Sequence, residues 1–480
     1  MKRKIIIFFL LAFSVIHHTQ AQDAHYWQSG FSPGGFLMPG AVIANNRDSG
    51  VFFYNPALLA LNPKSGISIS ANIYQYEHLN MKAGIGAHNP LKSTRLRIVP
   101  QIVSGSIALK KKKTIAIGYA LIHNAVLGYQ ATQRQDKKMD VLDNSYSPGQ
   151  EFYVGQYAAH NHINQTIAVL SAGIKLNERL AVGISAEGQV RSQDYFEDYR
   201  SRALINDGND IGLPPLTSVS TAYQVVYTHI GMRFKGGLSY EAGKHHFGLL
   251  VSSPLISLKG FATLTSDIAV ANLHLVNNTP SLNLLANDRQ TQLPVKYHLP
   301  FSIAGAYTLD YGRGQLYLAA EYFHKVNSYN IITPRAESFI RPDTGSANSF
   351  TKDLLRFRDE HRSLTNFALG ISYYVNSHLT AMASFRTDFT YSVKEPENYD
   401  GHLPYVVTWD NYHCQLGGNF RRKKANLRAG ILLSYGSTNK YKQPVNFDNP
   451  NEANLMLGDP TYGKASFFST GLLLSYIHNL

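Results

Sequence analysis

Hydrophobic and polar residues alternate with a period of two in many separate segments of this 480-residue chain. This pattern predicts β-strands with one apolar and one polar face. A transmembrane barrel needs such strands, because one face meets lipid and the other a wet lumen. A soluble β-sandwich alternates too, so the pattern alone leaves both open. In residues 180–191 the two faces are Leu180, Val182, Ile184, Ala186 and Val190 against Ser185, Glu187, Gln189 and Arg191.

Connection lengths separate the two alternatives. Short connections such as Asn177-Glu178 and Ser377-His378 alternate with long ones such as 129–160, 192–220 and 327–361. Membrane barrels place short turns on one rim and long loops on the other. We therefore predict an all-β, transmembrane antiparallel β-barrel of about 14 strands over residues 65–480. The strands are expected at 65–76, 95–109, 113–129, 161–176, 179–193, 221–240, 244–265, 295–309, 314–328, 362–376, 379–392, 403–421, 424–438 and 465–480.

The N-terminus indicates export. Basic residues 2–4 precede an apolar stretch over 5–16, and Thr19 to Ala21 are small or neutral. This is the layout of a cleavable signal peptide, and the apolar stretch is too short for a spanning helix. We expect residues 1–21 to be removed and the mature chain to lie in a Gram-negative outer membrane, in contact with outer-membrane lipid.

Composition fits a barrel better than other classes. The chain has 30 Tyr and 24 Phe but only 7 Met and 2 Trp, and 44% of its residues are hydrophobic. Its formal charge of +13 is concentrated in two turn-like clusters, Lys110 to Lys113 and Arg421 to Lys424. For an exported protein these clusters indicate solvated turns, and we expect no nucleic-acid partner. The single cysteine, Cys414, excludes an internal disulfide.

The sequence carries no motif of an enzyme. It has no P-loop, nucleophile elbow, H-E-x-x-H or C-x-x-C pattern. The pairs His160/His162 and His245/His246 lack an accompanying carboxylate or cysteine cluster, so surface histidines are the simpler interpretation. We expect no catalytic residues, no cofactor and no metal.

Residues 22–64 precede the first strand and contain no clear alternation. Within them, small and polar residues from Gly40 to Gly50 lead to Asn55-Pro56-Ala57. A later run, Leu293-Pro294 followed by 300–307, reads P-F-S-I-A-G-A-Y over its last eight residues and is similar to a P-x-S-x-x-x-G-A-x-Y pattern. Together these segments resemble the hatch and a late barrel strand of the FadL/TodX family of outer-membrane transporters for hydrophobic compounds. An ordinary Asn-Pro turn is the alternative interpretation of the first segment.

The resemblance implies passive uptake of a hydrophobic small molecule, such as a long-chain fatty acid. Residues 22–64 would form a hatch inside the barrel, with Asn55, Pro56 and Ala57 as its motif. Pro56 fixes one backbone dihedral and Asn55 can bond nearby backbone, which favours a compact plug over another strand. The ligand would be held in an internal pocket and released when the hatch moves. The candidate pocket residues are Phe36, Leu37, Phe52 and Phe53.

A lateral opening in the wall is a further expectation. An opening needs a local break in the hydrogen-bond ladder, since an intact barrel has no free edge. The alternation from Ile115 to Leu121 is interrupted at Ile122-His123-Asn124, which predicts a β-bulge there. Pro100 offers a second break, because it cannot donate a ladder bond. The alternatives are a wrongly placed strand boundary or a bulge without function.

Two other functions remain open on the same scaffold. The barrel could belong to a secretion or surface-assembly system, with external loops that dock a protein partner. It could also be a lipid-acting enzyme, although its Ser and His residues cannot be paired from sequence. An apolar cavity behind residues 36–59 that opens toward the third strand favours transport, and a lumen filled by polar side chains and ordered loops favours docking.

Overall fold

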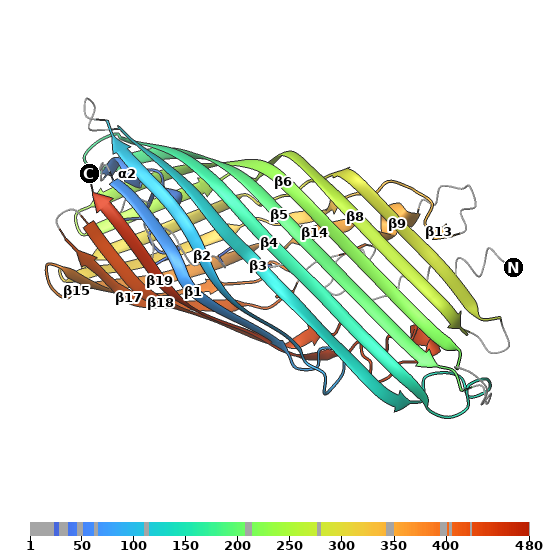
Figure 1. The fold of residues 1–480 in the computed structure, drawn as a ribbon. Helices are drawn as coiled ribbons and strands as arrows, with labels where there is room; N and C mark the ends of the chain where they lie inside the picture. The colour runs from blue at the N-terminus through green and yellow to red at the C-terminus, as the bar shows by residue number, and fades with distance from the viewer. Residues whose placement is uncertain are drawn as a thin grey trace.

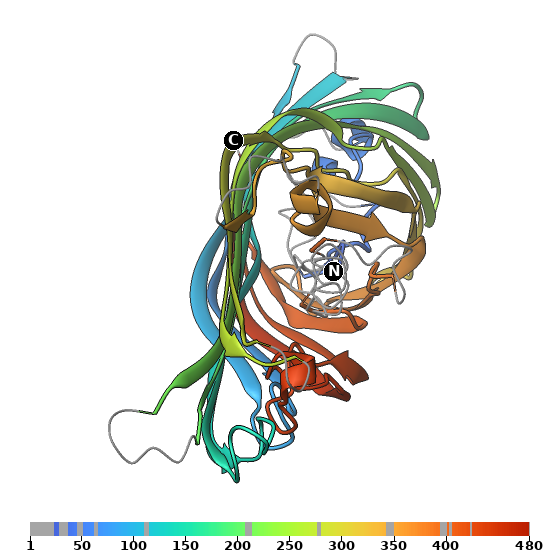
Figure 2. The same cartoon turned by 90° about the vertical axis from the view of Figure 1, so that its right-hand side faces the viewer.

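The wall of the molecule is one closed antiparallel sheet, seen from the side in Figure 1 and end-on in Figure 2. In this computed structural model, β1 (Gly66–Met81) pairs with both β2 (Leu91–Ala108) and β19 (Tyr462–Asn479), which closes the ring. The structure describes residues 24–27, 37–45, 51–61, 66–109, 115–206, 214–275, 280–341, 350–393, 401–402, 406–422 and 425–479. The predicted signal peptide, 1–21, and the cluster Lys110 to Lys113 lie outside them.

The wall has the predicted 14 strands when β7 and β8 are counted as one interrupted strand, and β9 and β10 as another. β7 and β8 both pair with β6 and follow one another along it. β9 and β10 likewise follow one another along β8 and β7. The other wall strands are β3 (Ile115–Met139), β4 (Glu151–Lys175), β5 (Leu180–Leu204), β6 (Leu216–Ala242), β7 (His245–Ser252), β8 (Ile256–Leu273), β9 (Leu282–Pro294), β10 (Ser302–Asp310), β11 (Gly314–Phe323), β15 (Leu364–Tyr374), β16 (Leu379–Asp388), β17 (Asn411–Arg421) and β18 (Ala425–Lys442).

Short turns and long connections lie on opposite rims, as predicted. The turns after β4, β6, β10 and β15 are at the end of the barrel that also holds the C-terminus in Figure 1. The long connections carry small elements: β12 (Val326–Ile332), β13 (Ile340–Arg341), α3 (Phe350–Leu354), β14 (Phe357–His361) and η2 (Glu452–Asn454). Among the described residues, no helix is long and apolar enough to cross a membrane.

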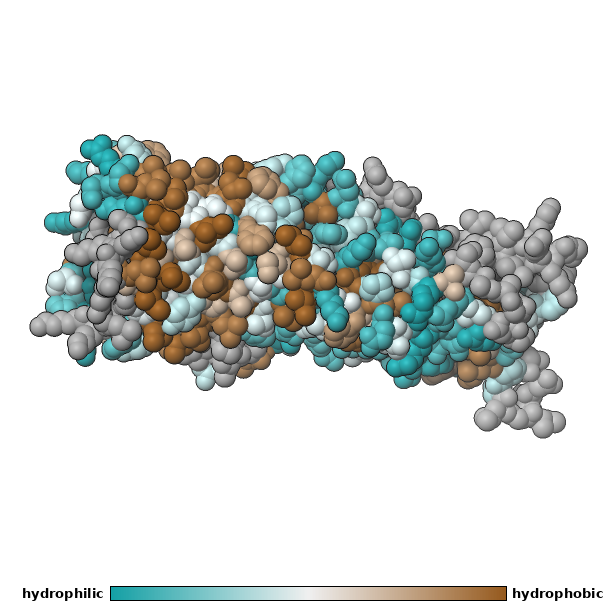
Figure 3. Space-filling model, turned by 90° about the horizontal axis from the view of Figure 1, so that it is seen from above, coloured by the Kyte–Doolittle hydropathy of each residue, from teal (hydrophilic) through white to brown (hydrophobic). Residues whose placement is uncertain are grey.

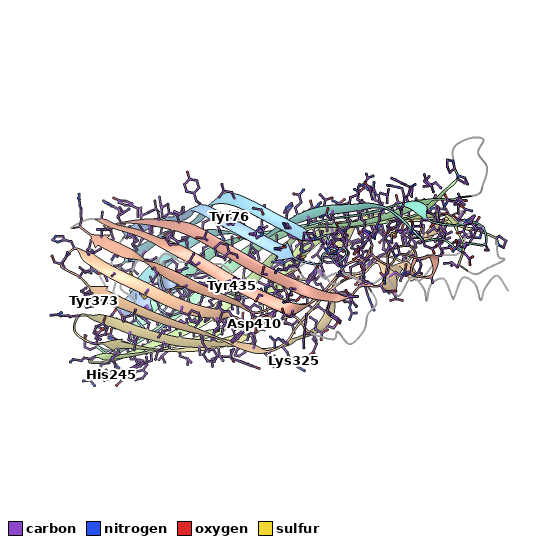
Figure 4. The ribbon with its side chains drawn as sticks, turned by 90° about the horizontal axis from the view of Figure 1, so that it is seen from below. Tyr76, His245, Lys325, Tyr373, Asp410 and Tyr435 are labelled. Atoms are coloured by element: carbon purple, nitrogen blue, oxygen red, sulfur yellow. The ribbon has the colours of Figure 1, made fainter. Side chains whose placement is uncertain are left out.

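An apolar band surrounds the half of the barrel nearer the short turns. Figure 3 shows this half largely brown and the half near the long loops largely teal. Outward side chains such as Leu121, Leu170 and Ile184 are 55%, 61% and 60% exposed. Figure 4 places Tyr373 at the short-turn edge and Tyr435 farther toward the loops. Aromatic residues at both edges of an apolar belt are typical of a barrel wall in lipid.

Four strands extend well beyond this band, and here the sequence prediction was wrong. Residues 129–160 and 192–220 were expected as loops, but β3 to β6 are 25 to 27 residues long and include most of these residues. Outside lipid the outward face no longer needs to be apolar, so the contrast between faces weakens. The inward face instead carries buried tyrosines that pack against the long loops: Tyr129, Tyr153, Tyr157, Tyr195, Tyr199, Tyr223 and Tyr227.

The predicted strand over 295–309 also requires correction. The wall there consists of β9, ending at Pro294, and β10, starting at Ser302. Residues 282–294 were expected in a loop, and 295–301 were expected in a strand. Val295 and Tyr297 are buried inside the barrel. The apolar character of 295–301 reflects this inward turn of the chain and not a lipid-facing strand.

One carboxyl group in the outer half of the barrel lies in a cage of tyrosines. Glu197 is on β5, beyond the apolar band, and accepts hydrogen bonds from the hydroxyls of Tyr157 (3.2 Å) and Tyr195 (2.8 Å). Burial raises the pKa of Glu197 to about 7. Because the folded-state pKa exceeds the unfolded value, stability falls as pH rises from about 4.5 to about 7 and is constant above that.

We predict that the outer halves of β4 and β5 loosen as the pH rises from mildly acidic to above 7. In hydrogen exchange, amides of 151–160 and 195–204 should exchange several-fold faster at pH 8.5 than at pH 5.5, after correction for intrinsic rates. Glu197→Gln should remove this difference, because its amide does not ionise. An unchanged pH dependence in the variant would show that another group is responsible.

The apolar band predicts where charge is not tolerated. Leu170→Arg places a guanidinium near the middle of the band and should lower the free energy of unfolding by about 2 to 4 kcal/mol in lipid vesicles. Ala158→Arg introduces the same charge on the same strand, beyond the band, and should cost little. Equal losses for the two variants in urea titrations would contradict the assigned membrane position.

Candidate ligand-binding cavity

Three glycines side by side on the inner wall form a seat for the Asn55-Pro56-Ala57 motif. Gly173 pairs with Gly183, and Gly183 pairs with Gly237, across β4, β5 and β6. A Cβ at Gly183 would lie 2.4 Å from the Pro56 carbonyl carbon, and one at Gly237 would lie 2.1 Å from the Asn55 Oδ1. Both distances are too short for carbon, so only glycine lets the motif lie this close to the wall.

Asn55 fixes the motif through hydrogen bonds. Its Nδ2 donates to the carbonyl oxygens of Ile43 (2.8 Å) and Leu238 (3.1 Å). Its Oδ1 accepts from the backbone N–H of Ala57 at 3.0 Å, which closes an Asx-type turn. Asn55 is fully buried. One side chain therefore joins two parts of the N-terminal segment to β6.

The rest of the described N-terminal segment also lies against the inner wall. Leu37 packs between Gly417 and Gly430, and the Ser384 hydroxyl donates to the Leu37 carbonyl at 2.6 Å. η1 (Val51–Phe53) and α2 (Leu58–Leu61) follow along β3, β4 and β5. Phe52 packs on Gly118. Residues 37–45 and 51–61 thus form a body inside the barrel.

A cavity of about 200 Å³ lies between this body and the wall. Of the predicted pocket residues, Phe53 lines it, Leu37 and Phe52 face the wall instead, and Phe36 lies outside the described residues. Sequence reasoning missed the wall residues, which come from distant strands. The apolar and aromatic lining is Tyr26, Trp27, Ile43, Phe53, Tyr54, Ile122, Val126, Ile167, Leu250, Tyr297, Leu299, Phe323 and Tyr391.

Charged side chains share the lining, and cations outnumber anions. The Lys235 Nζ lies 2.6 Å from the Glu187 Oε1 and 4.4 Å from the centre of the Phe53 ring. Arg191 lies 4.3 Å over the Tyr297 ring. The buried Arg386 has an Nε and a terminal nitrogen with no hydrogen-bond partner in the described part of the chain. The cavity can therefore hold an apolar body with a polar or anionic end.

The ladder between β2 and β3 is open beside this cavity. Within the described residues, β2–β3 pairing runs from Ala108↔Ala116 to Ile102↔Ile122 and ends there, two residues from Pro100. Farther toward the loops, the Ser93 hydroxyl accepts from the Gln130 N–H at 3.1 Å. Between these points, as in the rest of β3 toward the loops, the described residues of β3 form ladder pairs only with β4. The stretch between Ile122 and Gln130, beside the cavity, is the gap in the β2–β3 ladder.

The predicted gate residues lie at the edge of this gap, but the bulge is elsewhere. β3 pairs with β4 through His123 and Asn124, and the register shift falls between Ala125 and Leu127, so the bulged residue is Val126. Ile122 and Asn124 line the cavity. His123 faces outward, with its Nδ1 3.1 Å from the Thr166 Oγ. The break is therefore on the β2 side of β3.

In each histidine pair singled out in the sequence, one histidine lies beside a carboxylate. His160 lies 3.2 Å from Asp194, and His246 lies 3.1 Å from Asp310. No group of three or more potential ligands gathers among the described residues. His246 forms a hydrogen bond with Asp310, and His160 lies at ion-pair distance from Asp194.

The glycine seat gives a test of how the N-terminal segment is held. Gly183→Val should displace residues 51–61 and raise their protease sensitivity at least tenfold, because the backbone of Pro56 cannot rotate away. Gly188→Val is the matched control on the same strand, since a Cβ there meets nothing within 4 Å. Equal protease patterns for both variants would contradict the packed seat.

No family model matches the sequence, nor does any curated protein. Solved structures match over nearly the whole chain. A Pseudomonas aeruginosa FadL homologue is 13% identical with a TM-score of 0.55, covering 96% of this chain and 99% of its own. The Pseudomonas putida toluene transporter TodX is 12% identical with a TM-score of 0.57, covering 96% and 100%. The Ralstonia pickettii toluene transporter TbuX is 12% identical with a TM-score of 0.55, covering 94% and 99%.

At these identities the likeness concerns the fold. The 14-stranded closed wall is common to this chain and its structural neighbours, and the architecture expected from the Asn55-Pro56-Ala57 resemblance is confirmed at that level. This chain is a transmembrane β-barrel with the fold of the FadL and TodX family.

Proposed function

We propose that this chain is an outer-membrane channel for passive uptake of hydrophobic small molecules, long-chain fatty acids or similar amphiphiles. The observation that carries the proposal is the meeting of cavity and gap. Ile122, Asn124 and Val126 of β3 line the cavity at the place where the β2–β3 ladder ends. A molecule in the cavity would need to pass only these side chains to reach lipid.

The outer end of the gap holds a second, smaller hollow of about 20 Å³. Its lining includes Leu79, Arg95 and Phe467, and it shares Val126 with the main cavity. Val126, the bulged residue, therefore separates the two spaces. An apolar molecule could move from one to the other by a small displacement of this side chain.

The lining supports an amphiphilic ligand. Aromatic and aliphatic side chains would bury the hydrocarbon part, with burial worth about 25 cal/mol per Å² of apolar surface. Arg386, buried with unused donors, is placed to bind a carboxylate or another anionic end. Among the structural neighbours are proteins described as toluene transporters and a monoaromatic hydrocarbon channel, which supports a hydrophobic substrate class.

Residues 37–45 and 51–61 would act as part of the hatch. They lie between the cavity and the short-turn rim, so release on that side requires them to shift. The shift would break bonds to the wall: Asn55 to the Leu238 carbonyl, Ser239 to the Ala44 carbonyl and Ser384 to the Leu37 carbonyl, each worth about 1 kcal/mol net. These few bonds are compatible with movement driven by ligand binding and without an external energy source.

Filling the space at Val126 tests the route. Val126→Trp should close the passage between cavity and gap and slow uptake of a radiolabelled long-chain fatty acid into vesicles at least tenfold. Thr132→Trp, outward on the same strand and beyond the gap, should leave uptake unchanged. Normal uptake by folded Val126→Trp protein would contradict this route.

A second candidate function is docking of a protein partner in a secretion or surface-assembly system. It is favoured by the outer half of the barrel, where ordered loop residues such as Phe357, Trp409 and Phe447 fill the lumen against the tyrosines. Docking predicts a partner that stays bound in mild detergent and no fatty-acid uptake above that of empty vesicles. The proposed channel predicts the reverse.

A further inference from the structure

The wall is interrupted a second time, between β7–β8 and β9–β10. Below the break β7 pairs with β10 up to Ser252↔Ser302, and above it β8 pairs with β9 from Phe261↔Pro294. Residues 253–260 and 295–301 therefore face one another, and no ladder pair joins the first segment to the second in the described sheet. The backbone N–H of Leu255 donates to the Leu299 carbonyl across the break at 3.2 Å.

The break lies between the cavity and an apolar outer surface. Tyr297 and Leu299, on the inward-turned segment 295–301, both line the cavity. On the outside, Ile256 is 49% exposed, Leu258 58% and Phe301 38%. Pro254 and Pro300 stand on the two sides of the break, and neither can donate a ladder bond. A single layer of side chains thus separates the cavity from lipid here.

Arg233 holds the two sides together from within the barrel. Its Nε donates to the Ser253 carbonyl at 2.9 Å, on the β7–β8 side. One terminal nitrogen donates to the Pro300 carbonyl at 3.3 Å and the Ser302 hydroxyl at 3.2 Å, on the β9–β10 side. A charged donor therefore satisfies carbonyl groups that the ladder does not, and charge-assisted bonds of this kind are the stronger ones.

This clamp is connected to the N-terminal segment. The Ser302 hydroxyl donates to the Glu321 Oε1 at 2.8 Å. The Glu321 Oε2 accepts from the Trp27 indole N–H at 3.0 Å. Trp27 also contacts Gly40 in the segment 37–45. Hydrogen bonds thus run without interruption from Trp27 through Glu321 and Ser302 to Arg233 and the edges of the break.

We propose that the break between β7–β8 and β9–β10 is a second lateral gate between the cavity and lipid. Arg233 holds this gate shut, and it is released when Trp27 moves away from Glu321. This inference rests on the proposed uptake of hydrophobic molecules. With its indole partner gone, the Glu321 carboxylate attracts the Arg233 guanidinium, which shares the Ser302 hydroxyl with it. The Ser253 and Pro300 carbonyls then lose their donor, and the break widens.

Cross-linking tests whether the break must open. In a Cys414→Ala background, Leu255→Cys/Leu299→Cys joins the two sides of the break, and Phe247→Cys/Tyr307→Cys joins cross-strand partners in the intact ladder below it. Oxidation should slow fatty-acid uptake about five- to tenfold in the first variant, reversibly with reductant. It should have no effect in the second. Equal uptake by the oxidised and reduced forms of the first variant would overturn the gate.

A second measurement does not depend on transport. The rate at which a membrane-confined maleimide labels Leu299→Cys in the Cys414→Ala background reports opening directly. Arg233→Ala and Trp27→Phe should each raise this rate about tenfold, and Arg233→Lys should have a smaller effect. Unchanged rates would overturn the gate even if uptake is normal. Raised rates in a protein that takes up no fatty acid would instead refute the proposed function and leave the opening established.

Discussion

Backbone hydrogen bonding controls this structure, because lipid offers no partner to an unpaired N–H or C=O group. The closed ring from β1 to β19 satisfies this requirement over almost the whole wall. The two interruptions, above Ile122 and between β7–β8 and β9–β10, both border the internal cavity. At each one a side chain takes over part of the missing pairing: Ser93 for the first and Arg233 for the second. Among the described residues, the cavity is thus bordered by two breaks in the ladder of the wall.

The N-terminal segment inside the barrel depends on close packing of its backbone against the backbone of the wall. Gly173, Gly183 and Gly237 lie next to one another on three strands, so the Asn55-Pro56-Ala57 turn packs directly on the backbone of the sheet. Gly417 and Gly430 do the same for Leu37. Beyond this segment the lining becomes charged, with Lys235 beside Glu187 and Arg191 over Tyr297. Small residues thus position the N-terminal segment, and larger polar ones line the cavity above it.

Sequence patterns predicted the wall well where one face of a strand meets lipid and must be apolar while the other meets the lumen and can be polar. In β5, Ile184 meets lipid and Glu187 the lumen, so the alternation is strong. Beyond the band both faces of that strand meet polar groups or loops, and residues 192–204 were placed in a loop. β9 was missed for the same reason. The predicted gate residues 122–124 lie at the edge of the gap, but the bulge that was expected there is at Val126. The partners of Arg233, Trp27 and the glycine row come from distant strands, and one sequence does not show which strands meet. Glycines within strand interiors were the one available signal for the seat.

The central claim is that the cavity exchanges an apolar molecule with lipid through a wall that is incompletely hydrogen-bonded. Mass spectrometry of protein purified in mild detergent, followed by solvent extraction, tests it most directly. We expect a long-chain fatty acid or similar amphiphile in an amount approaching one per protein, and its loss when Arg386 is replaced by leucine. Protein that carries no such molecule, and that binds none when a long-chain fatty acid is supplied in excess, would contradict the account.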